Sequence, residues 1–327
     1  MPGFEGISFD AARALALHVF AAAGPAWIAL AVDRWLGEPP VRWHPVVWMG
    51  HYLGAVGRRI APLGMSPGRR LRPFVAGTSA WCAGAVVVAC VAWGAQRVVI
   101  ASPWWAGALL AGLLLKPLLA WRMLRDEVLA VETALAVSLD AGRARLARLV
   151  SRDVSALTEA EVRESAIESL AENLNDSVVA PVFWFVLLGL PGAAVYRFAN
   201  TADAMWGYIG LRNGRDWTWA GKWAARADDV LSWLPARLTA LLIGPATGLR
   251  IEARRTPSPN SGWPMAAMAL RLGVRLGKPG VYVLHPGGRS AVAGDVGSAA
   301  RWAGRAVAWT AFVVGGWAVW RGVSTGG

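Results

Sequence analysis

The sequence has few of the residues on which soluble enzymes usually depend. Only 17% of its 327 residues are charged, whereas 55% are hydrophobic, and its mean hydropathy is +0.40. An ordinary water-soluble core does not account for this composition. The two cysteines, Cys82 and Cys90, lie in one apolar run without Cys or His partners at metal-binding spacing. We therefore expect them to be small core residues and not metal ligands.

Common catalytic and nucleotide-binding motifs are also missing. The chain has no G-x-x-x-x-G-K-[ST], no G-x-S-x-G and no H-E-x-x-H, which excludes a Walker-type phosphate loop, a nucleophile elbow and a zincin site. Its four histidines are scattered. His44, in PPVRWHPVVWMG, has no evident partner, so an interfacial or packing role is favoured over that of a base.

Long apolar runs are what the sequence does contain. A helix needs roughly 20 residues to cross a ~30 Å hydrocarbon layer, and many of the 20 tryptophans lie near the ends of such runs, as in an interfacial aromatic belt. We predict an all-α, polytopic integral membrane protein with one membrane-embedded domain over residues 1–327. The clearest runs are 14–32, 74–100, 103–119 and 302–320, and two runs broken by Pro and Gly are 178–199 and 231–249.

The net charge of +12 comes almost entirely from arginine. The arginines lie in connections between apolar runs, where the positive-inside rule accounts for them, so we expect membrane lipid and no nucleic acid as a partner. The Arg-rich segment 34–73 is predicted to be cytoplasmic. Residues 121–177, rich in Ala, Leu, Arg and Glu, are predicted to form a cytoplasmic helical insertion, and the protein to reside in the cytoplasmic (inner) membrane with its site facing the cytoplasm.

A ladder of carboxylates precedes the broken run 178–199. Glu164, Glu168, Glu172 and Asp176 are spaced by four, so a helix places them in one stripe, opposite an apolar face. Such a stripe is often simply solvated. Here, however, the helix continues directly into VVAPVFWFVLLG, and a carboxylate at a membrane boundary is costly unless it is paired or bound to a metal.

Two further polar clusters follow, again at the ends of apolar runs. FANTADAMWGY contains amide, hydroxyl and carboxyl groups, and AARADDVLSWLPARL contains paired carboxylates between arginines. Hard oxygens suit a metal such as Mg²⁺ and arginine suits phosphate, so the recurrence predicts a Mg²⁺-phosphate site. With the ladder counted as the first cluster, the candidate residues are Asn200, Thr201 and Asp203 in the second cluster and Arg226, Asp228, Asp229 and Arg237 in the third.

These clusters can share a site only if the run between them does not cross the membrane. Leu190, Pro191 and Gly192 break that run about twelve residues after Val178, which reaches about half the thickness of the bilayer. We therefore predict a re-entrant helical hairpin whose turn is buried in protein.

Five ordered motifs resemble the cobalamin-biosynthesis CobD/CbiB family, over nearly the whole chain. They are VDRWLGEPPVRWHPVVWMG, AIESLAENLNDSVVAPVFWFVLLGLPGA, FANTADAMWGY, AARADDVLSWLPARLTALL and SPNSGWPMAAMA. Glu38 stands where the family usually has Asp, and Ser232 and Trp233 stand where Asn and Tyr are usual. The resemblance implies an adenosylcobinamide-phosphate synthase, an ATP-dependent ligase that joins aminopropanol or its phosphate to a propionate of adenosylcobyric acid. It implies ATP and Mg²⁺ as cofactors, and other membrane enzymes of the pathway or a homo-oligomer as possible partners.

The resemblance and the residue chemistry together suggest roles for the polar residues. The expected metal ligands are Glu172, Asp176 and Asp203. The candidates for a base or a second metal are Asp228 and Asp229, and Glu168 is a further catalytic candidate. The phosphate-binding candidates are Arg226 and Arg237, and the candidates for orienting the corrinoid or the nucleotide are Asn173, Asn200, Thr201 and Asn260.

Simpler interpretations stay open for several of these residues. The arginines suit interfacial anchoring, Asp228 and Asp229 suit the N-cap of a helix that begins at VLSWL, and Asn260 suits turn chemistry. The alternative function is a membrane transporter of a corrinoid or another polar solute, because transporters also use broken helices.

Overall fold

The computed structural model describes residues 9–65, 68 and 70–325, and most of this chain is helical. The α-helices are α1 (Phe9–Leu36), α2 (Pro45–Ile60), α3 (Leu71–Ala101), α4 (Trp104–Leu115), α5 (Trp121–Leu135), α6 (Leu139–Leu146), α7 (Glu159–Leu174), α8 (Ala180–Trp206), α9 (Lys222–Leu231), α10 (Trp233–Ile243), α11 (Leu249–Ala253), α12 (Gly262–Leu272) and α13 (Asp295–Thr325). Short 3₁₀ turns occupy Val41–Trp43 and Lys116–Leu118, and a π turn occupies Asn175–Val179.

Strand structure is confined to two short antiparallel hairpins in the described chain. The first pairs β1 (Leu211–Arg212) with β2 (Arg215–Asp216), and the second pairs β3 (Leu276–Lys278) with β4 (Tyr282–Leu284). Neither forms a layer of the fold, which confirms the predicted all-α class.

Five helical segments are long and apolar enough to cross a membrane by length and composition. They are Val19–Leu36, Leu71–Ala101, Trp104–Leu135, Glu159–Trp206 and Asp295–Ser324. They indicate a multi-pass membrane protein, and four of them overlap the four clear apolar runs of the sequence. Helix α10 has 11 residues, about 16 Å at 1.5 Å per residue, and is therefore too short to cross the bilayer by itself.

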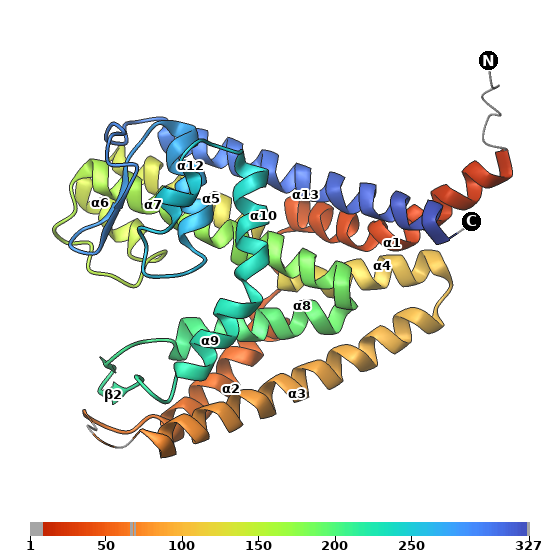
Figure 1. The fold of residues 1–327 in the computed structure, drawn as a ribbon, viewed down its shortest axis with the longest axis horizontal. Helices are drawn as coiled ribbons and strands as arrows, with labels where there is room; N and C mark the ends of the chain where they lie inside the picture. Colours follow the sequence, from red (N-terminus) through yellow and green to blue (C-terminus); the bar gives the residue numbers. More distant parts are fainter. Residues whose placement is uncertain (1–8, 66–67, 69, 326–327) are drawn as a thin grey trace.

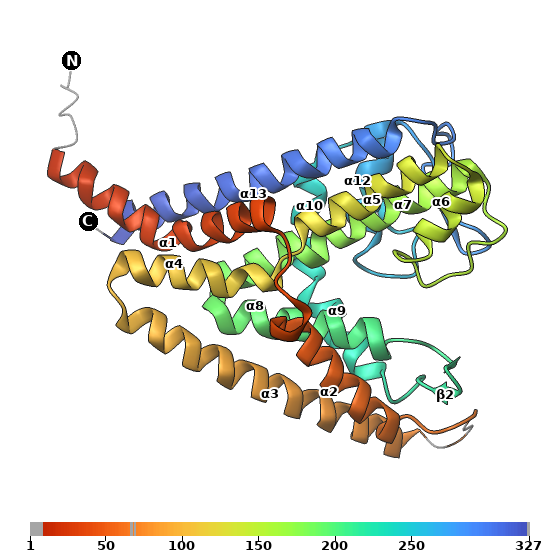
Figure 2. The same ribbon diagram turned by 180° about the vertical axis from the view of Figure 1, so that it is seen from behind.

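The long helices run side by side and leave a polar lobe at one end. Helices α1, α13, α4, α8 and α3 extend toward the end that carries both termini, whereas α5, α6, α7 and α12 form the lobe at the other end (Figures 1 and 2). Helix α10 runs across them and links α9 to the segment that leads to α12 (Figure 1). The lobe corresponds to much of the predicted insertion 121–177. Arg69, one of the arginines of segment 34–73, lies outside the described residues.

Helix α3 has an outer face suited to lipid. Val86, Val87 and Val91 are 61%, 62% and 70% exposed, which in water would be an unusually large apolar surface. Cys82 and Cys90 are exposed on the same helix. The expectation that the cysteines lie in a core was wrong, because a helix that faces lipid is apolar on its outer side as well.

Close approach between helices depends on small residues. A Cβ atom on Gly112 of α4 would lie 2.7 Å from the Ile28 side chain and 2.9 Å from the Pro25 carbonyl oxygen of α1. Membrane helices commonly pack through such positions, because lipid supplies no hydrophobic force to drive them together.

Candidate functional site

The chain between the carboxylate ladder and the second polar cluster folds back on itself. Helix α7 begins with a capping box, in which Thr158 and Glu161 bond each other's backbone N–H groups. It continues through the π turn into α8, which is interrupted at Gly189 (φ 67°, ψ −156°). Only glycine adopts this region readily. Gln96 of α3 accepts a hydrogen bond from the backbone N–H of Leu190 at 3.0 Å. The structure thus has a helical hairpin where the re-entrant hairpin was predicted, with its break one residue before the expected Leu190.

Arg197 joins the two ends of this hairpin. Its Nη1 donates to the backbone carbonyl oxygen of Asp176 at 3.0 Å, to Ser177 Oγ at 3.2 Å and to Asn200 Oδ1 at 3.3 Å. Asn200 Nδ2 in turn donates to Asp228 Oδ1 at 3.4 Å. The ladder, the second cluster and the third cluster therefore meet at one place, as expected if they form a single site.

We call Asp176, Asp203 and Asp228 the acidic centre. Burial raises the pKa of Asp228 well above its ordinary value, and the negative charges of Asp176 and Asp203 raise it further. Burial also raises the pKa of Asp229, although Arg226 opposes this. Closely spaced, buried carboxylates repel one another, so this region would bind a cation favourably.

The donor chemistry of the acidic centre fits Mg²⁺. Within the described ranges, no three His, Cys, Asp or Glu side chains are arranged to hold a metal ion by themselves. Mg²⁺ does not need such a cage, because it usually keeps several waters and uses one or two carboxylates together with substrate phosphates. Asp176, Asp203 and Asp228 offer carboxylates of this kind, and Glu172 lies close enough to Asp176 and Asp203 to feel their charges.

Asp176 is held by residues that lie outside the site predicted from the sequence. Asn175 Nδ2 donates to Asp176 Oδ1 at 2.8 Å, and Tyr196 Oη donates to the same oxygen at 3.5 Å. Thr239 of α10 donates to Asn175 Oδ1 at 3.1 Å, and Ser232 Oγ lies 3.1 Å from Tyr196 Oη. Tyr196 and its neighbour Arg197 had a visible signal, since polar and charged residues inside an apolar run are functional candidates.

A second group adjoins the acidic centre. Asn260 Nδ2 donates to the backbone carbonyl oxygen of Asp229 at 2.7 Å, and Arg237 Nη1 donates to Asn260 Oδ1 at 3.1 Å. The Arg237 guanidinium lies between the Trp233 and Trp263 rings, 4.1 and 4.7 Å from their centroids. Arg237 is thus fixed in place, whereas a simple interfacial anchor would be free. Asn260 also has turn chemistry, because Ser258 Oγ accepts from its backbone N–H.

Asp228 and Asp229 do not cap a helix. Both lie inside α9, and the N-cap of α10 is Ser232. The N-cap interpretation is therefore wrong. Arg226 pairs with Asp229 at 3.3 Å, with its side chain 71% exposed. Thr201 donates its hydroxyl to the Arg197 carbonyl oxygen of its own helix at 2.7 Å, so the hydroxyl hydrogen is already used.

The ladder is buried, which excludes a solvated stripe. Glu164 and Glu168 are only 2% and 3% exposed. Arg275 pairs with Glu164 at 3.4 Å, and Arg152 pairs with Glu168 at 2.7 Å. Helix α7 is thus buried on both faces, and arginines from other segments neutralise part of its acidic stripe.

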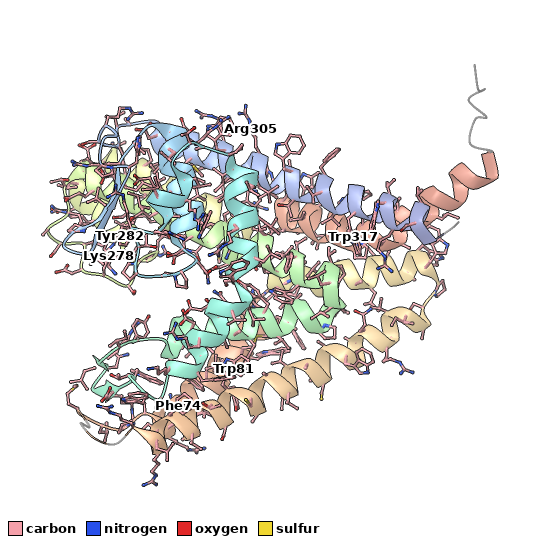
Figure 3. The ribbon with its side chains drawn as sticks, in the orientation of Figure 1. Phe74, Trp81, Lys278, Tyr282, Arg305 and Trp317 are labelled. Atoms are coloured by element: carbon pink, nitrogen blue, oxygen red, sulfur yellow. The ribbon has the colours of Figure 1, made fainter. Side chains whose placement is uncertain are left out.

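A small polar pocket lies along the ladder. It has a volume of about 180 Å³ and is lined by Glu168, Glu172 and Asn173 of α7, with Lys278 and Tyr282 from the second β-hairpin. Lys278 and Tyr282 lie in the polar lobe (Figure 3). Burial and the charges of Glu168 and Glu172 raise the pKa of Tyr282. Asn173 donates to the Ser169 carbonyl oxygen at 2.9 Å. Glu172 therefore connects this pocket to the acidic centre.

The early motif forms a buried ionic network. His44 Nε2 lies 3.1 Å from Glu38 Oε2, and Lys116 Nζ lies 3.0 Å from both Glu38 Oε2 and Asp33 Oδ1. Burial by itself would raise the pKa of Glu38, but the His44 hydrogen bond and the Lys116 charge outweigh it and hold the pKa below its ordinary value. The expectation that His44 lacks a partner was wrong, since Glu38, six residues earlier, turns back onto it. Lys116, inside an apolar run, was the missed signal.

Comparison with known proteins identifies a family model and several relatives that are similar to this chain in sequence. The family model described as "CobD/Cbib protein" matches residues 26–309. A protein named "Probable cobalamin biosynthesis protein CobD" from Methanothermobacter thermautotrophicus is 41% identical over 281 residues, which cover 79% of this chain and 84% of the relative. One of the same name from Thermococcus kodakarensis is 42% identical over 261 residues, covering 79% and 83%. The "Cobalamin biosynthesis protein CobD" of Brucella suis biovar 1 is 37% identical over 275 residues, covering 78% and 81%.

No solved structure matches the chain, so the assignment rests on sequence. The family match spans most of the chain, and it includes the early ionic network, the hairpin and the acidic centre. The chain belongs to the CobD/CbiB family.

Proposed function

We propose that this chain acts in cobalamin biosynthesis as a membrane-bound ligase. It would form an amide bond between the amine of aminopropanol, or of its phosphate, and a propionate carboxylate of adenosylcobyric acid, with ATP and Mg²⁺ as cofactors. The names of its relatives support the pathway. The observation that carries the chemistry is the convergence of Asp176, Asp203 and Asp228 beside Arg197 and Asn200 at the open ends of the hairpin.

Amide formation from a carboxylate and an amine is uphill in water, so the carboxylate has to be activated. ATP would supply that activation by phosphorylating the carboxylate with release of ADP, and the amine would then displace phosphate as the amide bond forms. Mg²⁺ held by Glu172, Asp176 and Asp203 would neutralise the charge of the phosphate groups. Arg237, positioned by Asn260, would bind phosphate oxygens. The amine nitrogen loses a proton as the C–N bond forms. Asp228 is suited to accept this proton, because its pKa is raised above the ordinary value of a carboxyl group. A general base is most effective when its pKa lies near the pH of the reaction.

The remaining polar residues would bind and orient substrate. Asn200 already positions Asp228, and the pocket beside Glu168, Glu172 and Asn173 offers hydrogen-bond partners for corrinoid amides. We place the site at the cytoplasmic face of the inner membrane, where ATP is available and where the positive-inside rule puts segment 34–73.

The test uses the purified full-length chain in detergent with adenosylcobyric acid, ATP, Mg²⁺ and each amine, followed by mass analysis of the corrinoid. We expect a product with the wild type that Asp176→Asn and Asp203→Asn abolish. Asp140→Asn is the matched control, because Asp140 is 91% exposed in a surface ion pair. Failure of the wild type to form an amide with either amine would contradict the ligase assignment, and full activity of both variants would contradict the metal assignment.

A corrinoid transporter is the alternative function. Helix α8 is discontinuous, and transporters build substrate sites from broken helices near the bilayer midplane. In this chain the carboxylates gather at the open ends of the hairpin, not at its Gly189 turn, which favours chemistry at the membrane boundary. Counterflow of labelled corrinoid in proteoliposomes without ATP would support transport instead.

A further inference from the structure

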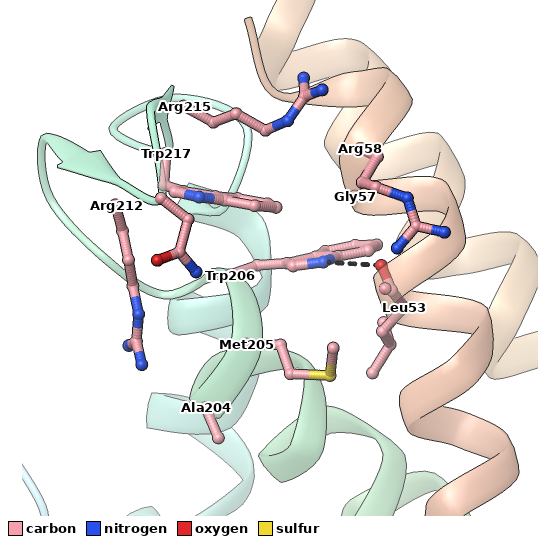
Figure 4. Close-up of a pocket in the computed structure, with 11 residues that line it drawn as sticks. Leu53, Gly57, Arg58, Ala204, Met205, Trp206, Arg212, Arg215 and Trp217 are labelled. Atoms are coloured by element: carbon pink, nitrogen blue, oxygen red, sulfur yellow. Dashed lines mark hydrogen bonds between the residues drawn. The ribbon is translucent and has the colours of Figure 1, made fainter. Parts of the chain in front are cut away.

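A second pocket lies beyond the end of α8 and contains concentrated positive charge. It is formed by α2, the last turn of α8 and the β1–β2 hairpin, and its volume is about 450 Å³. Arg58, Arg212 and Arg215 line it, together with Asn213. These arginines surround a central pair of tryptophan rings (Figure 4). No Asp or Glu is among its described lining residues, so it is distinct from the acidic centre.

The charges of this pocket are not neutralised by the protein. Within the part of the chain that the structure describes, Arg58, Arg212 and Arg215 have no carboxylate within ion-pair distance. Arg215 Nη1 donates to the Ala61 carbonyl oxygen at 2.7 Å, and the Arg212 guanidinium stacks on the Tyr208 ring, 3.6 Å from its centroid. Arg212 Nη1 is buried and has no hydrogen-bond partner. Such a donor is costly to leave unsatisfied, and an oxyanion would satisfy it.

The floor of the pocket is rigid and apolar. The Trp206 and Trp217 rings stack with centroids 6.2 Å apart and planes 19° apart. Trp206 Nε1 donates to the Leu53 carbonyl oxygen at 3.1 Å. A Cβ atom on Gly57 would lie 2.8 Å from Trp206 Nε1 and 2.9 Å from the Trp217 ring, so α2 packs directly against the pair. Arginines above an apolar floor suit a ligand with an anionic group and an apolar body.

The surroundings of the pocket indicate a membrane surface. Apolar side chains protrude from the loops beside it, at Leu63 (74% exposed), Met65 (62%), Ile209 (92%) and Leu211 (52%). Leu71, 74% exposed, begins the apolar helix α3 on the same side. Exposed apolar tips beside arginines are the arrangement by which a protein enters the headgroup layer of a bilayer.

A cation–π pair of interfacial type lies nearby. Arg70 and Lys222 both lie over the Trp219 ring, 5.6 and 4.3 Å from its centroid. Tryptophan and basic residues concentrate at the membrane–water interface. The pocket therefore lies beside the beginning of a helix long and apolar enough to cross a membrane, where lipid phosphates would be expected.

We infer that this pocket binds the phosphate headgroup of an anionic phospholipid. Guanidinium groups recognise phosphate oxygens through paired hydrogen bonds, and the lipid backbone and upper acyl chains would lie along the tryptophan floor and the exposed loop residues. A soluble phosphate ester shares the anionic chemistry but would not use the protruding apolar side chains. The site is independent of the proposed ligase function.

The test measures lipid binding to the delipidated full-length chain by native mass spectrometry in detergent. We expect phosphatidylglycerol to bind more tightly than phosphatidylcholine. The double variant Arg212→Gln/Arg215→Gln should weaken phosphatidylglycerol binding at least about tenfold, since each basic residue near an anionic lipid surface contributes about fivefold. The matched control is Arg250→Gln/Arg254→Gln, which removes two exposed arginines of the α11 segment and should leave binding unchanged.

Two further measurements keep the inference falsifiable. Asn213→Asp adds a negative charge to the pocket at an exposed position with φ 51°, which Asp tolerates, and it should weaken phosphatidylglycerol binding without unfolding the chain. Equal loss in the control double variant, or equal binding of both lipids, would overturn the site. Displacement of the lipid by millimolar glycerol 3-phosphate would assign the pocket to a soluble phosphate ester and overturn the lipid.

Discussion

The Arg197 guanidinium lies 3.0 Å from the backbone carbonyl oxygen of Asp176, across the open end of the α8 hairpin. The two residues come from opposite ends of a segment that leaves the site and returns to it. Arg197 also reaches Asn200 and, through it, Asp228. One cation thus organises the backbone and side chains on which the acidic centre depends.

Replacement of this cation should destabilise the protein. Arg197→Met removes hydrogen bonds from a charged donor to three acceptors, and we expect a loss of about 2–3 kcal/mol in the free energy of unfolding. Thermal unfolding in detergent measures this loss. The control is Arg226→Met, because the Arg226 side chain is 71% exposed in its ion pair, and such pairs contribute about 0–1 kcal/mol. Equal effects of the two variants would contradict the bridging role.

The turn of the hairpin should tolerate no side chain at Gly189. Its φ and ψ lie in a region nearly restricted to glycine, at a cost of about 1–3 kcal/mol for other residues. A Cβ atom there would also lie 2.6 Å from Gln96 Oε1. We expect Gly189→Ala to lower the melting temperature and the yield of folded protein. Gly94→Ala, within α3, meets nothing within 4 Å and should be neutral or slightly stabilising.

The Glu38 network should make stability depend on pH. The pKa of Glu38 is lower in the folded protein than in the unfolded chain. Its contribution is therefore present above the unfolded pKa of about 4.3 and is lost as pH falls through the folded value. We expect Glu38→Gln to cost about 2 kcal/mol at pH 7 and much less once the pH falls below the folded pKa of Glu38. Melting curves across this range test the prediction, with the exposed Asp140→Asn as control; a pH-independent difference would contradict it.

The hairpin also predicts the topology of the chain. We expect a membrane-impermeant maleimide to label Ser155→Cys and Lys222→Cys from the same side and Ala101→Cys from the other, in a Cys82→Ala/Cys90→Ala background. All three positions are exposed. The reason is that α8 returns to the side from which it started. Labelling of positions 155 and 222 from opposite sides would mean that α8 crosses the bilayer.

Several features followed from the sequence because they depend on local pattern. The membrane helices came from apolar runs of bilayer length, and the hairpin came from the Leu190-Pro191-Gly192 break after a run too short to cross. Its break lies one residue earlier, at Gly189. The spacing of the ladder put Asp176 at the start of the run 178–199. Because that run was interpreted as a hairpin, Asp176 was correctly predicted to lie beside the later clusters.

Other features depend on which distant segments pack together, and no local pattern carries that information. Arg152 and Arg275 pair with carboxylates of the ladder. Arg152 lies in the loop between α6 and α7, and Arg275 directly precedes β3. The sequence pattern did not predict either ion pair. His44 was read without a partner because Glu38 contacts it only when the intervening prolines turn the chain back.

By itself, the sequence determined the helical membrane architecture, since hydrophobic length and glycine conformation are properties of short segments. Tertiary structure alone decided which charges neutralise one another and which remain free. The interaction of two charges depends on their separation and burial, and these are set by packing between segments far apart in the chain.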